Sequence, residues 1–399
     1  MVDTVTGPFD PSPDSLRSSK AIKWHHVGAD VIPAGIAETD FGPCPAVTEA
    51  VGALLERGDL GYPDWPVEPL AEAFCRRMEG RHGWHPDAAH VRHVCDLIQA
   101  FQVVVELACP PGGAVALHVP NYPPFLRSLH AMGRRAVGSP LVPADPAASG
   151  GGAHGWAFDA ARLEEAVAET GATVLLVVNP HNPTGRVLSR QELTSLAEIA
   201  CRHDMVVVSD ELHAELLHGS ARHVPFASLG EEVAARTVTI TSATKSFNLG
   251  GLRTAVAHVG DAGVRSAWDR MPPEYFGSLN VVGVEATLAA WRDGDAWLEA
   301  KCRHLTAMRD HLAARAAALP GVVLRPPEAT YLAWLDCRGA GLGDDPARFF
   351  LEEARVDLVP GFDFGPGGAG HARLNFGTGV RILDEIVDRM AAGLASRPE

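Results

Sequence analysis

The chain has 399 residues, of which 46% are hydrophobic and 21% charged, a composition typical of a globular protein with two or three domains. Its formal net charge of −15 argues against binding DNA, RNA or anionic lipid, because no basic face would neutralise phosphates. Its seven cysteines are odd in number and form no C-x-x-C pair, which predicts reduced thiols and neither a disulfide framework nor a metal site.

The first twenty residues are polar and rich in proline and lack an apolar core, so we expect a flexible arm rather than a secretory signal. No apolar run approaches the roughly 18 residues that span a bilayer. Residues 143–155 (PADPAASGGGAHG) have the composition of a surface loop. These features predict a soluble, cytoplasmic protein with no membrane partner.

The middle third of the chain alternates predicted strands and helices. Residues 173–178 form a short apolar run typical of a strand buried on both faces. A capping box, Ser189 with Glu192, then starts a helix. Two further strands are predicted at 205–208 and 237–241. This alternation predicts an α/β fold with a mostly parallel sheet flanked by helices.

Three polar clusters directly follow these strands, at 179–186, at Asp210 and at Lys245. The carboxyl edge of an open α/β sheet is where ligands bind, so we expect the clusters to converge. Hydroxyls, glycines and Arg253 around Lys245 suit a phosphate held beside an amine nucleophile. Asp210 suits a pyridine nitrogen, and Asn182 can donate to a phenolate-type oxygen. Taken singly, each cluster is equally explained as a turn or a helix cap.

The ordered set N-P-H-N-P-T-G, S-D-E and S-x-x-K-x-F-N-x-x-G-L-R resembles class I/II aminotransferases, which have pyridoxal-5′-phosphate (PLP) fold type I. The separations are also similar: 210 − 182 = 28 and 245 − 210 = 35 residues. The resemblance implies that Lys245 is the catalytic lysine and holds PLP as a Schiff base. It also implies that Ser242 and Arg253 bind the phosphate, with Asp210 and Asn182 contacting the ring.

Further motifs resemble the cystathionine β-lyase (MalY/PatB-type C–S lyase) branch: D-E-L-H at 210–213, Y-L-A-W-L-D at 331–336 and R-L-N-F at 373–376. The implied cofactor contacts are the His213 imidazole, the stacking ring of Tyr122 and the phosphate-binding Tyr62 of a partner subunit. Arg373 would clamp the substrate carboxylate beside Asn182.

Two segments depart from that branch. Residues 33–41 read PAGIAETDF where the branch has P-x-W-V-A-D-M-D-F, so Gly35 replaces a tryptophan beside the substrate, next to Ile36 and Ala37. Asp96 stands where the branch has a phosphate-binding glycine turn, and an aspartate there is unfavourable unless it points away or is paired. Backbone N–H groups of Leu97 and Ile98 at a helix start can still hold the phosphate.

The resemblance implies a homodimeric enzyme with active sites shared between its chains. We expect a large PLP domain at 46–280, a small C-terminal α/β domain at 281–399, and an N-terminal arm at 1–45 that is part of the small domain. The predicted reaction is β-elimination from a bulky cysteine S-conjugate, giving a thiol, pyruvate and ammonia. The alternatives are an aminotransferase, a decarboxylating or oxidative deamination of such a conjugate, and a PLP-binding pseudoenzyme.

Overall fold

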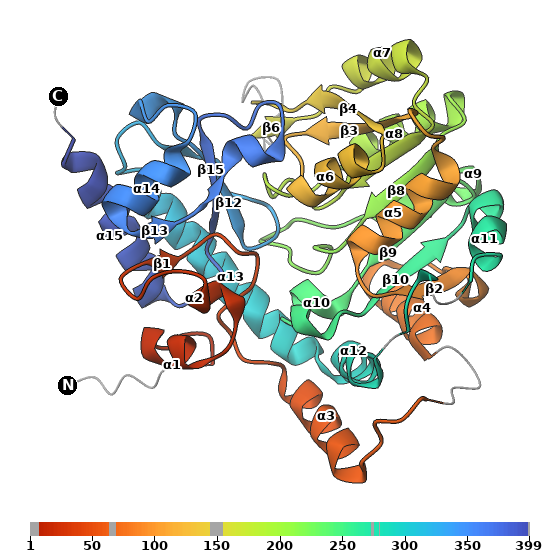
Figure 1. Cartoon of the computed structure of the whole chain (residues 1–399), viewed down its shortest axis with the longest axis horizontal. Coiled ribbons are helices and arrows are strands. Elements are labelled where there is room, and N and C mark those ends of the chain that lie inside the picture. Colours follow the sequence, from red (N-terminus) through yellow and green to blue (C-terminus); the bar gives the residue numbers. More distant parts are fainter. Residues whose placement is uncertain (1–7, 64–68, 144–154, 273–274, 279, 398–399) are drawn as a thin grey trace.

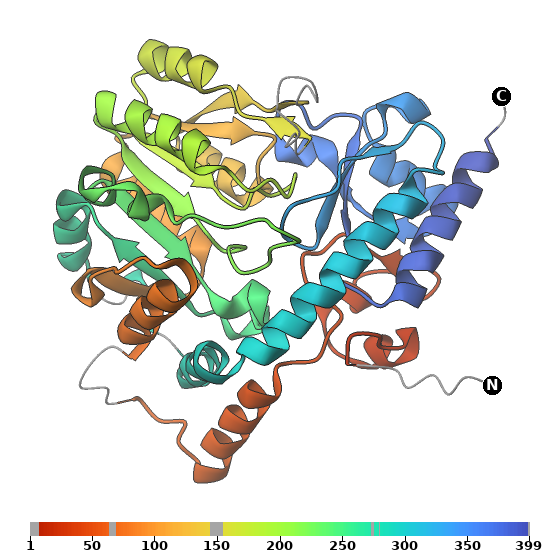
Figure 2. The same ribbon diagram turned by 180° about the vertical axis from the view of Figure 1, so that it is seen from behind.

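A computed structural model describes residues 8–63, 69–143, 155–272, 275–278 and 280–397, which form an α/β fold with one large and one smaller sheet (Figures 1 and 2). The large sheet has seven strands in the order β2-β10-β9-β8-β7-β3-β4. Adjacent strands from β4 to β9 pair in parallel, whereas β10 pairs antiparallel with both β9 and β2. Its strands are β2 (Val91–Val94), β3 (Ala114–Val119), β4 (Arg135–Pro140), β7 (Val174–Val178), β8 (Val206–Asp210), β9 (Thr237–Thr241) and β10 (Ala255–Val259).

Helices cover both faces of this sheet, and each face has its own apolar core. One face packs against α5 (Leu97–Ala108), α6 (Pro123–Ala131) and α11 (Ala262–Asp269). The opposite face packs against α7 (Ala160–Thr170) and α8 (Arg190–Arg202), with the four-residue α9 (Glu231–Ala234) nearby. The central strand β7 (VLLVV) is buried on both sides and is therefore apolar throughout.

The local patterns in the sequence correspond closely to these elements. The run at 173–178 contains β7, the run at 237–241 is β9, and Ser189 caps α8 in a complete capping box with Glu192. The strand predicted at 205–208 begins one residue later and continues to Asp210, so this carboxylate is its last residue. The loop predicted at 143–155 falls mostly outside the described residues, between β5 (Val142–Pro143) and β6 (Trp156–Ala157).

The smaller sheet has four strands in the order β11-β12-β15-β14, all antiparallel. They are β11 (Val323–Leu324), β12 (Leu332–Asp336), β14 (Val359–Pro360) and β15 (His371–Asn375). Figure 2 shows the long helix α13 (Asp295–Ala316) running diagonally between the two sheets. The helices α14 (Pro346–Ala354) and α15 (Val380–Ala395) complete this part.

The N-terminal segment joins the smaller sheet region through a long-range pairing. Its strand β1 (Ile32–Pro33) lies parallel to β13 (Val356–Asp357). The part of the expected arm that is described is ordered: it contains α1 (Pro13–Ser18), and the Phe9 ring lies 5.2 Å from that of Phe41. The Phe9 ring also lies 5.9 Å from Trp297 and 5.5 Å from His304, and these aromatic contacts with α13 dock the arm on the body.

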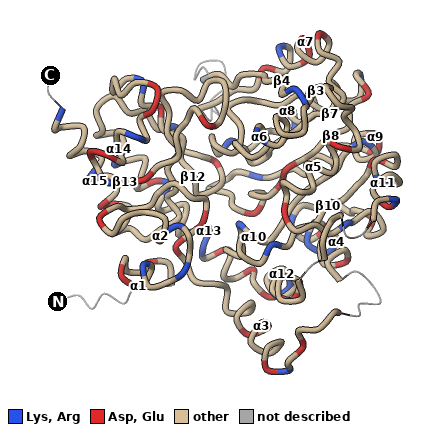
Figure 3. The backbone as a smooth tube through the Cα atoms, in the orientation of Figure 1, with Lys and Arg blue, Asp and Glu red and all other residues tan. Residues whose placement is uncertain are grey.

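The remaining helices are short or peripheral. Helix α3 (Pro45–Arg57) lies at the lower edge of Figure 1 and packs against α12 (Val281–Asp293). Lys and Arg side chains are interspersed with Asp and Glu along the chain (Figure 3), so the negative net charge is not gathered into one acidic block. Among the described residues no helix is long and apolar enough to cross a membrane. These helices are α2 (Ile22–His25), α3 (Pro45–Arg57), α4 (Pro69–His82), α10 (Ala243–Ser246) and α12 (Val281–Asp293).

Candidate active site

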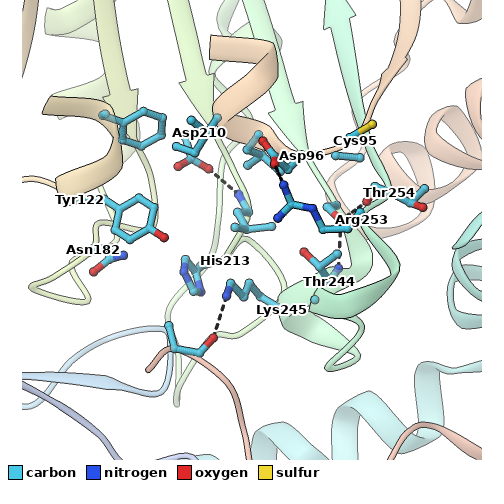
Figure 4. A pocket seen from close by; sticks show the side chains of 18 residues that line it. Cys95, Asp96, Tyr122, Asn182, Asp210, His213, Thr244, Lys245, Arg253 and Thr254 are labelled. Carbon is cyan, nitrogen blue, oxygen red and sulfur yellow. Dashed lines mark hydrogen bonds and ion pairs between the residues drawn. The ribbon is translucent and has the colours of Figure 1, made fainter. Parts of the chain in front are cut away.

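A cavity of about 160 Å³ opens at the carboxyl ends of β3, β7, β8 and β9 (Figure 4). The three polar clusters predicted to converge do so here. The lining residues are Ala37, Cys95, Asp96, Leu97, Ile98, Tyr122, Phe125, Asn182, Asp210, Leu212, His213, Ser242, Thr244, Lys245, Gly250, Arg253, Thr254 and Ala255.

Lys245 lies on the short helix α10, which begins directly after β9. Its Nζ donates a hydrogen bond of 2.7 Å to the carbonyl oxygen of Ala37. Burial, and then the positive charge of Arg373, lower the pKa of Lys245 to about 8. A lysine with this pKa is partly a free amine near neutral pH, as a nucleophile and general base requires.

Asp210 lies across the cavity from Lys245, at the last position of β8 (Figure 4). Its Oδ1 accepts a hydrogen bond of 3.1 Å from the Leu212 N–H. Burial raises the pKa of Asp210 to about 7. The neighbouring Glu211 is held differently, in an ion pair of 2.9 Å with His223. Asp210 is thus the carboxylate that faces the cavity, and it can still bind a cationic group.

Tyr122, Asn182 and His213 form the wall between these two groups (Figure 4). The Asn182 Oδ1 accepts a hydrogen bond of 3.1 Å from Arg373 Nη1, which directs its amide N–H groups elsewhere. Burial lowers the pKa of His213 to about 3, so its ring is neutral. The buried His213 Nδ1 has no hydrogen-bond partner among the described residues. This wall offers an aromatic face and spare polar groups to a planar ligand.

The opposite end of the cavity is rich in hydrogen-bond donors. Arg253 follows the 3₁₀ turn at 250–252 in a left-handed conformation, with φ of 50°. Leu97 and Ile98 begin α5, where backbone N–H groups have no partner within the helix. Ser242 caps α10, and its hydroxyl donates to the Thr254 carbonyl at 2.6 Å. Donors of this kind bind phosphate.

Four predicted site residues do not line the cavity. Arg373 lies just behind Asn182, buried, with Nη2 donating to the Gly35 carbonyl at 3.0 Å and Nε unpaired among the described residues. Gly35 and Ile36 lie behind Ala37, because the segment after β1 meets the cavity only at residue 37. Tyr62 is fully exposed, at 102%, after helix α3.

Asp96, which the sequence marked as unfavourable unless paired, pairs with Arg253. Two further residues near the site were given no role from the sequence. The buried Tyr331 hydroxyl donates at 3.0 Å to Ala37, the carbonyl that also accepts from Lys245. Lys301 is fully buried, and its Nζ donates to the backbone carbonyls of Lys245 at 3.0 Å and Ser246 at 2.9 Å. The signal for Lys301 is its position on an apolar helix face, three residues after one leucine and four before another.

The chemistry of the donor set fits PLP. One end provides a guanidinium, a helix start and hydroxyls for a phosphate, and the other provides the buried carboxylate of Asp210 for a pyridine nitrogen. Lys245 and His213 lie across the cavity from both groups (Figure 4), and the His213 Nδ1 has no hydrogen-bond partner among the described residues.

Comparisons with known proteins agree with this geometry. The family model described as "Aminotransferase class I and II" matches residues 29–390. The chain is 32% identical to cystathionine beta-lyase PatB of Bacillus subtilis, covering 97% of this chain and 100% of that one. It is also 32% identical to the cystathionine beta-lyase of Corynebacterium glutamicum, covering 96% and 99%. The PLP-bound C-S lyase from Staphylococcus hominis superposes with a TM-score of 0.87 at 26% identity, over 96% and 98% of the two chains.

Proposed function

The chain belongs to the class I and II aminotransferase family, and from that membership we propose that it is a PLP-dependent carbon–sulfur lyase acting on a cysteine S-conjugate with a bulky group on sulfur. The observation that carries the proposal is the single cavity lined by Lys245, Asp210, Tyr122 and Arg253. Relatives named as cystathionine β-lyases and a C-S lyase support this reaction class.

The cofactor would be held at both ends and through Lys245. Arg253, Ser242 and the first N–H groups of α5 would hold its phosphate, and Tyr122 would stack on its ring. Asp210 would keep a proton at the ring nitrogen, because its buried carboxylate is stabilised by a cationic partner. PLP bound in this way supplies an electron sink for a carbanion at the substrate Cα.

The chain's own residues would place the substrate and move its proton. We assign Arg373 to the α-carboxylate, since its buried fork has an unpaired Nε and matches a carboxylate. The Lys245 amine, whose pKa of about 8 makes it an effective base, would remove the Cα proton. The bond from Cβ to sulfur would then break, giving a thiolate and, after hydrolysis, pyruvate and ammonia.

The bulky substrate is proposed from Gly35. Its φ is outside the left-handed region, so a turn does not demand glycine here. A Cβ at residue 35 would lie 3.3 Å from Val359 Cγ2 and from Asp357 Oδ2. Val359 pairs in register with Arg373 on β15, so a side chain at residue 35 would press on the strand next to the proposed carboxylate clamp. The bulky substrate is therefore proposed from the resemblance, in which glycine replaces a tryptophan beside the substrate.

We also propose that the enzyme is a homodimer, with residues 46–280 as its large domain. Tyr62 is fully exposed and lies outside the cavity of its own chain. An exposed tyrosine that does not enter its own cavity is available to a second copy, and the resemblance implies that this tyrosine contacts the partner's phosphate site.

Product analysis with S-substituted cysteines tests the reaction. A thiol together with pyruvate supports β-elimination. A keto acid that retains sulfur, with amine transfer to an acceptor, supports an aminotransferase and overturns the lyase. Release of carbon dioxide supports decarboxylation instead, and cofactor binding without any product supports a pseudoenzyme.

Variants at Gly35 test the size of the substrate. Gly35→Trp should lose about tenfold or more of its activity on large S-conjugates while keeping activity on S-methylcysteine. Gly35→Ala is the matched control, since its single methyl group probes the 3.3 Å contacts alone. A lowered melting temperature in both variants with equal loss on both substrates would mean that the glycine serves packing against β13 and β14, and would reject the bulky pocket.

A further inference from the structure

Asp96 contributes an acidic group to the donor-rich end of the cavity. It is the N-cap residue of α5, and its Oδ1 accepts a hydrogen bond of 2.7 Å from the Gln99 N–H. Its Oδ2 pairs with Arg253 Nη2, across 157 residues of sequence (Figure 4). One carboxylate therefore engages both the first turn of α5 and the guanidinium.

These are also the groups assigned above to the cofactor phosphate. A carboxylate and a phosphate dianion at one arginine repel each other and compete for the same N–H donors. The side chains of Arg253 and Asp96 are 62% and 28% exposed, so solvent screens the pair and an incoming anion can replace it. Asp96 is therefore paired with Arg253, the same residue that we assign to the cofactor phosphate.

We propose that Asp96 is an intramolecular competitor of the cofactor phosphate for Arg253, which weakens cofactor binding and makes it reversible. The inference rests on the proposed function, since it assumes that PLP binds with its phosphate at this end. It predicts that removing the negative charge of Asp96 strengthens the binding of any phosphate-bearing ligand at this end of the cavity.

Asp96→Asn separates charge from helix capping. Asparagine caps helices as well as aspartate does, so α5 keeps its first hydrogen bond while the charge is lost. The matched control is Asp261→Asn. Asp261 caps α11 through the same contact, accepting from the Val264 N–H at 2.7 Å, and does not line the cavity.

The experiment titrates cofactor-free protein with PLP and follows the visible absorbance of the lysine-bound cofactor. Asp96→Asn should bind PLP about threefold to tenfold more tightly than wild type, in the range of a partly screened charge pair. Inorganic phosphate should raise the melting temperature of this variant at lower concentrations than for wild type. Pyridoxal, which lacks the phosphate, should bind both proteins equally, and Asp261→Asn should behave as wild type throughout.

Two results would overturn the competition. Weaker or equal PLP binding by Asp96→Asn would mean that Asp96 holds Arg253 in position for the phosphate instead. An equal gain for pyridoxal would mean that the effect does not involve the phosphate. If wild type gives no visible band at any PLP concentration, the proposed function fails as well, which distinguishes the two failures.

Discussion

The cavity is bounded by two regions that are held in place by contacts of different range. On the cofactor side, Asn182, Asp210 and Lys245 lie on or directly after neighbouring strands of one sheet. On the substrate side, the segment 33–41 is held by residues more than 300 positions away: β1 pairs with β13, and Asn375 Nδ2 donates to the carbonyls of Ile36 and Glu38 at 2.6 and 2.7 Å. Short-range sequence patterns therefore place the residues on the cofactor side of the cavity. Side chains far away in the sequence hold the segment 33–41 on the substrate side.

Lys245→Ala should give the largest effect on the cofactor side. We expect loss of the visible band and of turnover, because we assign this amine as both the cofactor attachment and the base. The melting temperature should change little, since removing a polar side chain at a cleft creates no core cavity. Borohydride fixation followed by peptide mass spectrometry checks the assignment. The chain has four lysines, so labelling of Lys301 or Lys23 would contradict it, and the exposed Lys20→Ala is the control.

Arg253→Ala should weaken the same region without abolishing it. Loss of a charge-assisted contact to phosphate costs about 1.5–3 kcal/mol, or roughly 10- to 150-fold in PLP affinity. Turnover at saturating PLP should be largely retained. Arg292→Ala removes a comparable arginine from an exposed pair with Asp293 and should leave PLP affinity unchanged. Unchanged affinity in Arg253→Ala would place the phosphate elsewhere.

Two buried asparagines compare the regions directly. Asn375→Ala removes three hydrogen bonds that hold segment 36–38 and the Gly377 N–H, at a cost of about 1–3 kcal/mol. We expect a higher KM with PLP affinity unchanged. Asn121→Ala removes contacts to the His118 carbonyl and the Tyr122 N–H, so it should weaken PLP binding instead. PLP titrations and KM measurements on both variants check this prediction. If each variant changed PLP affinity and KM equally, the distinction between a cofactor side and a substrate side would be rejected.

The smallest expected effect concerns Lys301, which connects α13 to the turn that carries Lys245. Burial lowers the pKa of Lys301 to about 7, so between pH 7 and about 10 the folded protein binds fewer protons than the unfolded chain. The free energy of unfolding should therefore rise with pH in this window, by at most ~1.4 kcal/mol per unit. Thermal melts at pH 7 and 9 should show a larger gain for wild type than for Lys301→Met, which keeps the contribution of Lys245. An identical rise in melting temperature for wild type and Lys301→Met would contradict the lowered pKa of Lys301.

The same contrast explains what the sequence could predict. The strand at 237–241, the Ser189 cap and the convergence of Asp210 with Lys245 depend on patterns within a few residues and on the general rule for sheet edges. The sequence could not predict that Lys245 and Tyr331 donate to the same carbonyl of Ala37, because these contacts span 208 and 294 residues. It also could not predict that Gly35 lies behind the cavity lining. The resemblance identified Arg373, but only the structure shows it behind Asn182 rather than on the wall.

The segment 35–38 makes its inward contacts through main-chain oxygens. These carbonyls accept from Arg373, Asn375, Tyr331 and Lys245, so none of the contacts depends on which side chain the segment carries. Side chains at residues 36–38 can therefore be exchanged while the backbone keeps its contacts to Lys245, Tyr331 and Asn375. Ala37, which lines the cavity, is then a position where a library can vary the shape of the cavity and leave these main-chain contacts in place.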